Sequence, residues 1–108
     1  MISTTMKRVY TVDDIRDRLS PIFNKNGVHK AILFGSYATG VATEESDVDI
    51  VAYMDSDIDI LDFCAMSVDV EDALSKKVDF ILGEDVVIGG RIDLVLRSEG
   101  VVLFEKVR

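Results

Sequence analysis

Three aspartates occupy positions where their carboxylates could act together. Asp47 and Asp49 are two residues apart at the start of the alternating segment 47–53, so on a strand they share one face, with Cα atoms roughly 6.6 Å apart. Asp79 interrupts the apolar run 78–82, where a charge needs a partner or solvent. Adjacent carboxylates repel each other without a counter-ion, and their hard oxygens suit Mg²⁺ or Mn²⁺. We therefore predict a metal site at Asp47, Asp49 and Asp79; the alternative for Asp79 is a solvent-facing position on an edge strand.

The Asp-x-Asp pattern also occurs at 55–57 and 57–59, but there it lies in an acidic connection. A connection of this kind is typically a solvated loop. An EF-hand starting at Asp55 is excluded, because its sixth position is Ile60 instead of glycine and its twelfth is Met66 instead of glutamate. The first strand-borne pair, Asp47 and Asp49, is therefore the better metal candidate.

A glycine-bounded turn, Gly35 to Gly40, follows the apolar run 31–34. Free backbone N–H groups of such a turn can hold phosphate oxygens, and Ser36 adds a hydroxyl donor. The turn is not a Walker A loop, because Val41 and Ala42 stand where lysine and serine or threonine would be required. We predict a phosphate-binding turn at Gly35 and Ser36 without the P-loop NTPase fold.

Other catalytic arrangements lack the residues they need. His29 is the only histidine and Cys64 the only cysteine, which disfavours a Ser-His-Asp triad and a zinc site. We expect His29 to be an ordinary surface residue at the start of a strand. We expect Cys64 to be a small core residue, since free cysteines are among the most buried side chains.

Helical and strand patterns alternate along the chain. Thr11 and Asp14 form a capping-box pattern before a helix that is kinked or restarted at Pro21 and ends at Asn26-Gly27. Apolar periodicity predicts further helices at 60–74 and from Ile88 to Gly100, and strands at 28–34, 47–53, 78–82 and 101–105. This order predicts an α/β (α+β) fold, with helices packed on one sheet.

Length and charge limit the functional classes. The 108 residues, of which 48% are apolar and 30% charged, predict one domain spanning 1–108. The net charge is −8; no basic residue occurs between Lys30 and Lys76, and the segment 44–72 carries eleven acids. Such a segment repels a phosphate backbone, so we expect no direct nucleic-acid binding and instead metal ions or a basic protein partner. Solubility alone is the alternative role for most of these acids.

Neither a membrane span nor a signal region is expected. The longest apolar stretches are far shorter than the roughly 18 residues a span requires, and residues 1–9 contain no hydrophobic signal region. The single cysteine cannot form an internal disulfide. We therefore expect a cytoplasmic protein without membrane association.

The combination of Gly35-Ser36, ten intervening residues, Asp47-Val48-Asp49 and the later Asp79 resembles the minimal nucleotidyltransferases of the DNA polymerase β superfamily. The resemblance runs from about Thr11 to Glu105. It implies the polymerase-β-like fold, with a mixed sheet of about four strands. It also implies that Gly35 and Ser36 hold a nucleoside triphosphate such as ATP, Asp47 and Asp49 bind the catalytic Mg²⁺ or Mn²⁺, and Asp79 helps to bind metal and to position or deprotonate the attacking hydroxyl.

One position departs from the family pattern. Thr39 stands where family members often carry arginine in the turn, which removes a cation that would contact the triphosphate. Among the remaining basic residues, Lys30, Lys76, Lys77 or Arg91 could restore that charge.

The resemblance also implies a partner. Larger relatives carry an extra domain that binds the acceptor, and we expect this chain to lack one, so the acceptor must bring its own binding surface. Small proteins of this kind are similar to antitoxins that transfer AMP from ATP to a tyrosine of a HEPN-type ribonuclease toxin, which implies a hetero-oligomer. Two alternatives remain open. The first is a non-enzymatic antitoxin whose acidic segment masks a basic toxin surface, and the second is a transferase for a small hydroxyl substrate.

Overall fold

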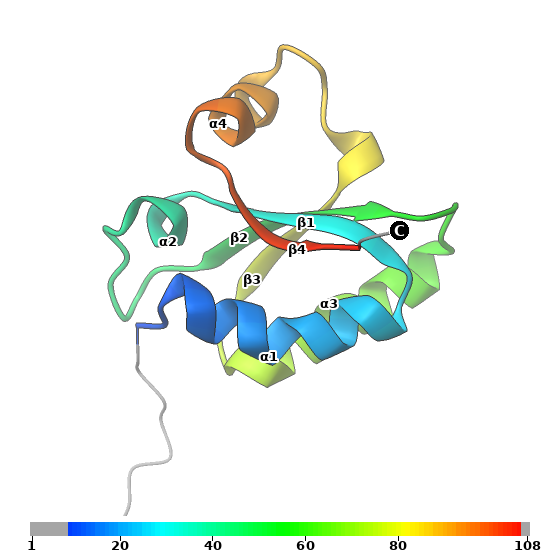
Figure 1. Cartoon of the computed structure of the whole chain (residues 1–108), viewed down its shortest axis with the longest axis horizontal. Coiled ribbons are helices and arrows are strands. Elements are labelled where there is room, and N and C mark those ends of the chain that lie inside the picture. Colours follow the sequence, from blue (N-terminus) through cyan, green and yellow to red (C-terminus); the bar gives the residue numbers. More distant parts are fainter. Residues whose placement is uncertain (1–8, 107–108) are drawn as a thin grey trace, which may run out of the picture.

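The computed structural model describes residues 9–106 and contains a four-stranded sheet in the order β3-β2-β1-β4 (Figure 1). β1 (Val28–Phe34) pairs antiparallel with both β2 (Val48–Met54) and β4 (Val101–Glu105), whereas β2 pairs parallel with β3 (Val78–Leu82). The predicted mixed sheet is confirmed. Residues 1–8, where no signal region is expected, and 107–108 lie outside the described residues.

Helices cover the two faces of the sheet unequally. α1 (Val12–Lys25) and α3 (Ile60–Leu74) lie side by side on one face, and α4 (Arg91–Glu99) lies alone on the other (Figure 1). A four-residue helix, α2 (Ser36–Thr39), follows β1, and the short 3₁₀ turn η1 (Gly83–Asp85) follows β3. None of the helices within residues 9–106 is long and apolar enough to cross a membrane.

The main core lies between the sheet and the α1–α3 layer. Val48, Ile50 and Ala52 alternate along β2 and are fully buried against this layer. The rings of Phe23 and Phe63 both stack on Phe80 of β3, with centroids 6.3 and 5.0 Å away. Burial of these large apolar side chains is the principal stabilisation of the fold, and it leaves the residues between them on β2 facing α4.

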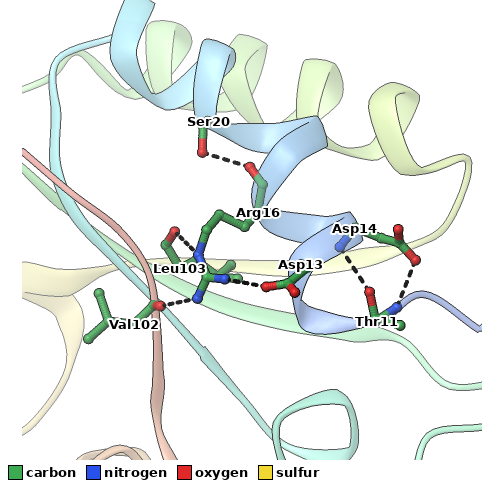
Figure 2. Close-up of polar contacts among 7 residues, drawn as sticks. All are labelled: Thr11, Asp13, Asp14, Arg16, Ser20, Val102 and Leu103. Atoms are coloured by element: carbon green, nitrogen blue, oxygen red, sulfur yellow. Dashed lines mark hydrogen bonds and ion pairs between the residues drawn. The ribbon is translucent and has the colours of Figure 1, made fainter.

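The first helix begins as predicted but is continuous. Thr11 accepts a hydrogen bond from the Asp14 amide, and Asp14 accepts one from the Thr11 amide, each at 3.0 Å (Figure 2). Pro21 lies inside α1 and does not restart it, since the helix runs without interruption from Val12 to Lys25. Ile15 and Phe23, which flank the proline, are both fully buried, so packing on the sheet holds both halves in one helix.

A single arginine ties α1 to the edge strand β4. The Arg16 guanidinium donates from Nε to the Leu103 carbonyl at 3.1 Å and from Nη2 to the Val102 carbonyl at 2.9 Å (Figure 2). Its Nη1 forms an ion pair with Asp13 at 2.8 Å. The planar guanidinium makes these three contacts at once, which fixes the position of β4 relative to the helix.

Several sequence predictions need correction. β2 begins at Val48, so Asp47 precedes the strand, and α4 begins at Arg91, so the 85% exposed Ile88 lies in the preceding loop. The turn at Gly35-Ser36 opens the short helix α2. Cys64 is exposed and is not a core residue, because α3 turns Phe63 and Met66 toward the sheet instead.

Candidate active site

The site is organised around two carboxyl groups on neighbouring strands. Asp49 of β2 stands opposite Asp79 of β3 in the parallel pair, and their side chains are hydrogen-bonded to each other. Both neighbours of Asp49 on β2, Val48 and Ile50, are buried in the main core, so alternation directs Asp49 to the α4 side of the sheet. β3 is an edge strand and Asp79 is exposed, yet Asp79 contacts Asp49 as well as solvent.

The pKa of Asp49 reflects this crowding. Partial burial is the largest cause that raises its pKa from 3.8 to about 6, followed by the hydrogen bond with Asp79 and then by the negative charges of Asp79 and Asp47. Each of these disfavours a second full negative charge at the site. A cation placed against the pair would remove that penalty.

The turn after β1 is fitted closely to Asp49. Phe34, the last residue of β1, is the register partner of Asp49 on β2. A Cβ on the next residue, Gly35, would lie only 2.3 Å from Asp49 Oδ2, and Gly35 has φ +75° and ψ −153°, a conformation that is essentially restricted to glycine. Position 35 therefore needs glycine for two reasons, and the turn backbone lies directly against the carboxylate.

The first residues of helix α2 follow Gly35 directly and lie beside the Asp49 carboxylate. The Gly35 carbonyl accepts hydrogen bonds from the amides of Ala38 and Thr39 at 3.0 and 3.2 Å. The amides of Ser36 and Tyr37 precede these first helical bonds, which is where N–H groups remain available for an anion. Gly35 and Ser36 therefore lie at the start of this short helix, next to Asp49, and their contact with phosphate stays a prediction.

A cavity of about 400 Å³ joins these groups to α4. Its lining combines apolar walls with a few charged side chains, as is usual for small-molecule sites. The lining residues are Phe34, Gly35, Asp49, Asp79, Ile81, Arg91, Ile92, Val95 and Glu99. A slightly larger cavity, about 460 Å³ near Tyr53 and Gly83, contains none of the predicted site residues.

Only one of the four candidate cations lines the active-site cavity. Arg91 is the first residue of α4 and lines this cavity. Its side chain makes no hydrogen bond or ion pair with any other residue in 9–106. The three lysines have other contacts: Lys30 with Glu105 at 4.0 Å, Lys76 with the Glu44 carbonyl at 2.8 Å, and Lys77 with Asp47 at 3.9 Å. Thr39 uses its hydroxyl within α2, bonding to the Gly35 carbonyl at 3.3 Å.

The third predicted metal ligand is placed differently from the other two. Asp47 lies just before β2, and its Oδ2 faces Lys77. Within residues 9–106, no cluster of three or more His, Cys, Asp or Glu side chains is arranged to hold a metal ion. The hydrogen-bonded Asp49–Asp79 pair nevertheless supplies the hard oxygen donors and the uncompensated charge that suit Mg²⁺ or Mn²⁺. The donor set at the pair therefore fits a divalent cation, and the charge of Asp47 contributes to raising the pKa of Asp49.

Sequence reasoning did not identify the contribution of α4 to the cavity. Ile92, Val95 and Glu99 line it beside Arg91, but helical periodicity cannot show which face of a sheet a helix covers. No signal in the sequence separates Glu99 from the other exposed acids. Its position becomes evident only once α4 is seen on the face opposite α1 and α3 (Figure 1).

A family model and a related protein both identify the chain as a nucleotidyltransferase. Residues 17–107 match the family described as polymerase beta, nucleotidyltransferase. A candidate protein adenylyltransferase of Methanocaldococcus jannaschii is 34% identical over 70 residues, which cover 65% of this chain and 75% of that protein.

Solved structures share the fold. A toxin–antitoxin crystal structure with AMP-PNP aligns with a TM-score of 0.72 at 19% identity, over 84% of this chain and 73% of that chain. An antitoxin in complex with a tri-AMPylated HEPN toxin of Shewanella oneidensis aligns with a TM-score of 0.68 at 16% identity, over 89% of this chain and 74% of that chain. A candidate minimal nucleotidyltransferase aligns with a TM-score of 0.71 at 24% identity, over 92% of this chain and 98% of that chain.

Replacing Gly35 by alanine tests the contact between the turn and Asp49. Gly40→Ala is the matched control, since Gly40 also has a positive φ, +81°, but open space where a Cβ would lie. The control should lose about 1–2 kcal/mol of unfolding free energy from backbone strain alone. Gly35→Ala should lose clearly more, as measured by urea denaturation, because it also displaces the Asp49 carboxylate and because the ψ of −153° at Gly35 strains alanine more than the ψ of 14° at Gly40. Equal losses would contradict the close approach.

The pKa of Asp49 predicts a pH-dependent stability. With metal removed by EDTA, the folded chain holds a proton between about pH 4 and 6 that the unfolded chain has released, so its unfolding free energy declines as pH rises through this range. Asp49→Asn removes this contribution and should gain stability over the wild type as pH rises to about 6, with a constant difference above it. Solvent exposure keeps the effect small. Urea denaturation from pH 4 to 7 measures it, and a difference that does not vary with pH would contradict the assignment.

Proposed function

The chain belongs to the polymerase beta nucleotidyltransferase family, and from this premise we propose that it is a Mg²⁺-dependent enzyme that transfers AMP from ATP to a tyrosine hydroxyl of a HEPN-type ribonuclease toxin, thereby acting as its antitoxin. One observation carries the enzymatic part of the proposal. The hydrogen-bonded Asp49–Asp79 pair lies against the Gly35 turn in a cavity that also contains a free arginine. Anion-binding backbone and metal-binding carboxylates therefore meet at one place, as phosphoryl transfer requires.

The reaction is a substitution at the α-phosphorus of ATP. The acceptor oxygen forms a bond to that phosphorus, the bond from it to the oxygen bridging toward the β-phosphate breaks, and pyrophosphate leaves. The acceptor hydroxyl gives its proton to a carboxylate of the site. Divalent metal ions bound at the carboxylates would supply Lewis-acid activation of the nucleophile and neutralise charge on the phosphates.

Each residue then has a distinct role in the proposal. The backbone at Gly35 and the Ser36 hydroxyl hold the triphosphate, while the Asp49 carboxylate, with Asp79 beside it, holds the divalent cation and Asp47, two residues before Asp49, is an additional ligand. Asp79 contributes a further carboxylate that orients or deprotonates the acceptor hydroxyl. Arg91 supplies the cation that Thr39 does not, because it alone among the four candidate cations lines the cavity.

The choice of acceptor is supported by related proteins. The Methanocaldococcus relative carries a name that specifies AMP transfer to protein, and the Shewanella structure contains a HEPN toxin that is itself AMPylated. The AMP-PNP structure pairs an ATP analogue with the same fold. These observations favour a protein acceptor over a small hydroxyl substrate.

Masking of the toxin without chemistry is the second candidate function. The segment 44–72 contains eleven acids and no basic residue, so it complements a basic surface without any need for ATP. Binding and transfer are separable, because only transfer depends on the cavity.

A transfer assay distinguishes the two functions. The wild type is incubated with ATP, Mg²⁺ and a purified HEPN-type toxin from the same genome, and intact-mass spectrometry records the toxin. We expect the toxin to gain the mass of AMP on tyrosine, and we expect the transfer rate to fall by at least about a hundredfold in Asp49→Ala, with strong losses in Asp47→Ala and Ser36→Ala. Leu94→Ser, exposed on α4 outside the cavity lining, is the control that should transfer normally. No added mass with the wild type, together with full toxin neutralisation by Asp47→Ala/Asp49→Ala, would contradict the transferase and favour masking.

A further inference from the structure

Helix α3 carries apolar side chains on both its inner and its outer face. Its inner face places Phe63, Met66, Val70 and Leu74 against the sheet. A helix that buries only one face usually carries polar residues on the other, and a helix that is apolar all round is normally covered on all sides. The outer face of α3 departs from this rule within the described residues.

The outer face carries a continuous apolar stripe. Leu61, Cys64 and Val68 are spaced by three and four residues, so they lie above one another along the helix. Leu61 is 75% exposed and Val68 56% exposed, Cys64 is exposed, and Ile60 adds a 66% exposed side chain at the start of the helix. Exposed apolar patches with a polar border commonly mark interaction sites.

Acidic side chains border this stripe. Exposed aspartates stand at both ends, at 57, 59 and 62 near the start of α3 and at 69 and 72 near its end. The chain has no basic residue between Lys30 and Lys76, so α3 itself contributes no cation. Arg18 of α1 reaches α3 only at the last turn, where it donates to the Ala73 carbonyl at 3.4 Å.

The active-site cavity lies on the other side of the sheet. α3 covers one face of the sheet and α4 the other (Figure 1). Val48, Ile50 and Ala52 are buried in the core on the α3 side, whereas Asp49 lines the cavity with residues of α4. A partner seated on the outer face of α3 is therefore separated from the cavity by both α3 and the sheet. Whatever binds there is not the group that enters the active site.

We propose that the outer face of α3, from Ile60 to Val68, docks a helix of a protein partner whose apolar seam is bordered by lysine and arginine side chains. The apolar stripe gives the interface a core that excludes water, and the acidic border selects a basic partner. The identity of that partner as the HEPN-type toxin rests on the proposed function, whereas the chemistry of the partner helix does not. A second copy of this chain would bring the same acidic border and be repelled.

Docking on this face has a consequence for AMP transfer. The docked helix holds the partner on one side of the molecule while the acceptor hydroxyl enters from the other. The acceptor tyrosine must therefore lie on a different segment of the partner or on another copy within a partner oligomer. Docking should also proceed without ATP or Mg²⁺.

Cys64 gives a direct readout, because it is the only cysteine of the chain and lies within the stripe. Its alkylation by iodoacetamide is followed in the full chain, without ATP or Mg²⁺, alone and with two probes. The first is a synthetic amphipathic helix with a leucine seam flanked by lysines, compared with the same peptide carrying glutamates. The second is the purified HEPN-type toxin. We expect the lysine peptide and the toxin each to slow alkylation by about tenfold at saturation, and the glutamate peptide to have no effect.

Substitutions on the stripe supply the matched comparison. Leu61→Ser combined with Val68→Ser should abolish protection by both probes. Leu94→Ser alters an apolar residue of α4 that is 57% exposed, about as much as Val68, and should leave protection intact. All three changes are at the surface, and thermal melting checks that each variant is folded.

The outcomes separate this inference from the proposed function. A Cys64 that stays fully reactive with both probes overturns the docking face, as does a toxin that binds the Leu61→Ser/Val68→Ser variant normally. Protection of Cys64 in the chain alone, increasing with its own concentration, also overturns it, because a second copy is then the occupant. Protection by the lysine peptide with no binding of the toxin supports the docking face and contradicts the toxin as partner.

Discussion

The repulsion between two neighbouring carboxylates is the constraint on which the candidate active site depends. Asp49 and Asp79 are side by side because β2 and β3 run parallel in register, and a parallel pair requires a crossover connection, which is α3. Gly35 allows the preceding turn to approach the same carboxylate without a clash. Partial burial, followed by the hydrogen bond with Asp79 and the charges of Asp79 and Asp47, raises the pKa of Asp49. The sheet order, the crossover and the glycine turn thus converge on a place that favours a cation.

Local sequence signals were sufficient for most of the fold. The capping box at Thr11 and the apolar runs of the strands appear close to their predicted limits, because caps and short apolar runs depend on neighbouring residues. Once β1, β2 and β3 pair in register, Asp49 is brought next to Asp79 and next to the turn at Gly35. Asp47 lies one residue before β2, and its Oδ2 is 3.9 Å from Lys77 Nζ, so the strand register alone does not place its side chain.

Features that depend on distant packing could not be predicted from the sequence. The burial of Cys64 was predicted wrongly because α3 carries apolar side chains on both its inner and its outer face, so periodicity does not identify the face that meets the sheet. The role of Arg91 required knowledge that α4 lies over the Asp49 face of the sheet, and that the lysines have other contacts. Both features depend on which face of the sheet each helix covers: α4 lies over the cavity, and α3 lies on the opposite face.

The central claim is that the Asp49–Asp79 pair holds the divalent cation, and Mn²⁺ binding tests it most directly. Electron paramagnetic resonance of free Mn²⁺ is recorded while the metal is titrated into the wild type, Asp49→Asn, Asp79→Asn and the distant control Asp69→Asn, each with AMP-PNP. Removing a ligand of a carboxylate site weakens binding substantially. The account predicts that Asp49→Asn and Asp79→Asn each lose at least about tenfold in Mn²⁺ affinity, whereas Asp69→Asn binds as the wild type does. Equal affinity in all four proteins would contradict it.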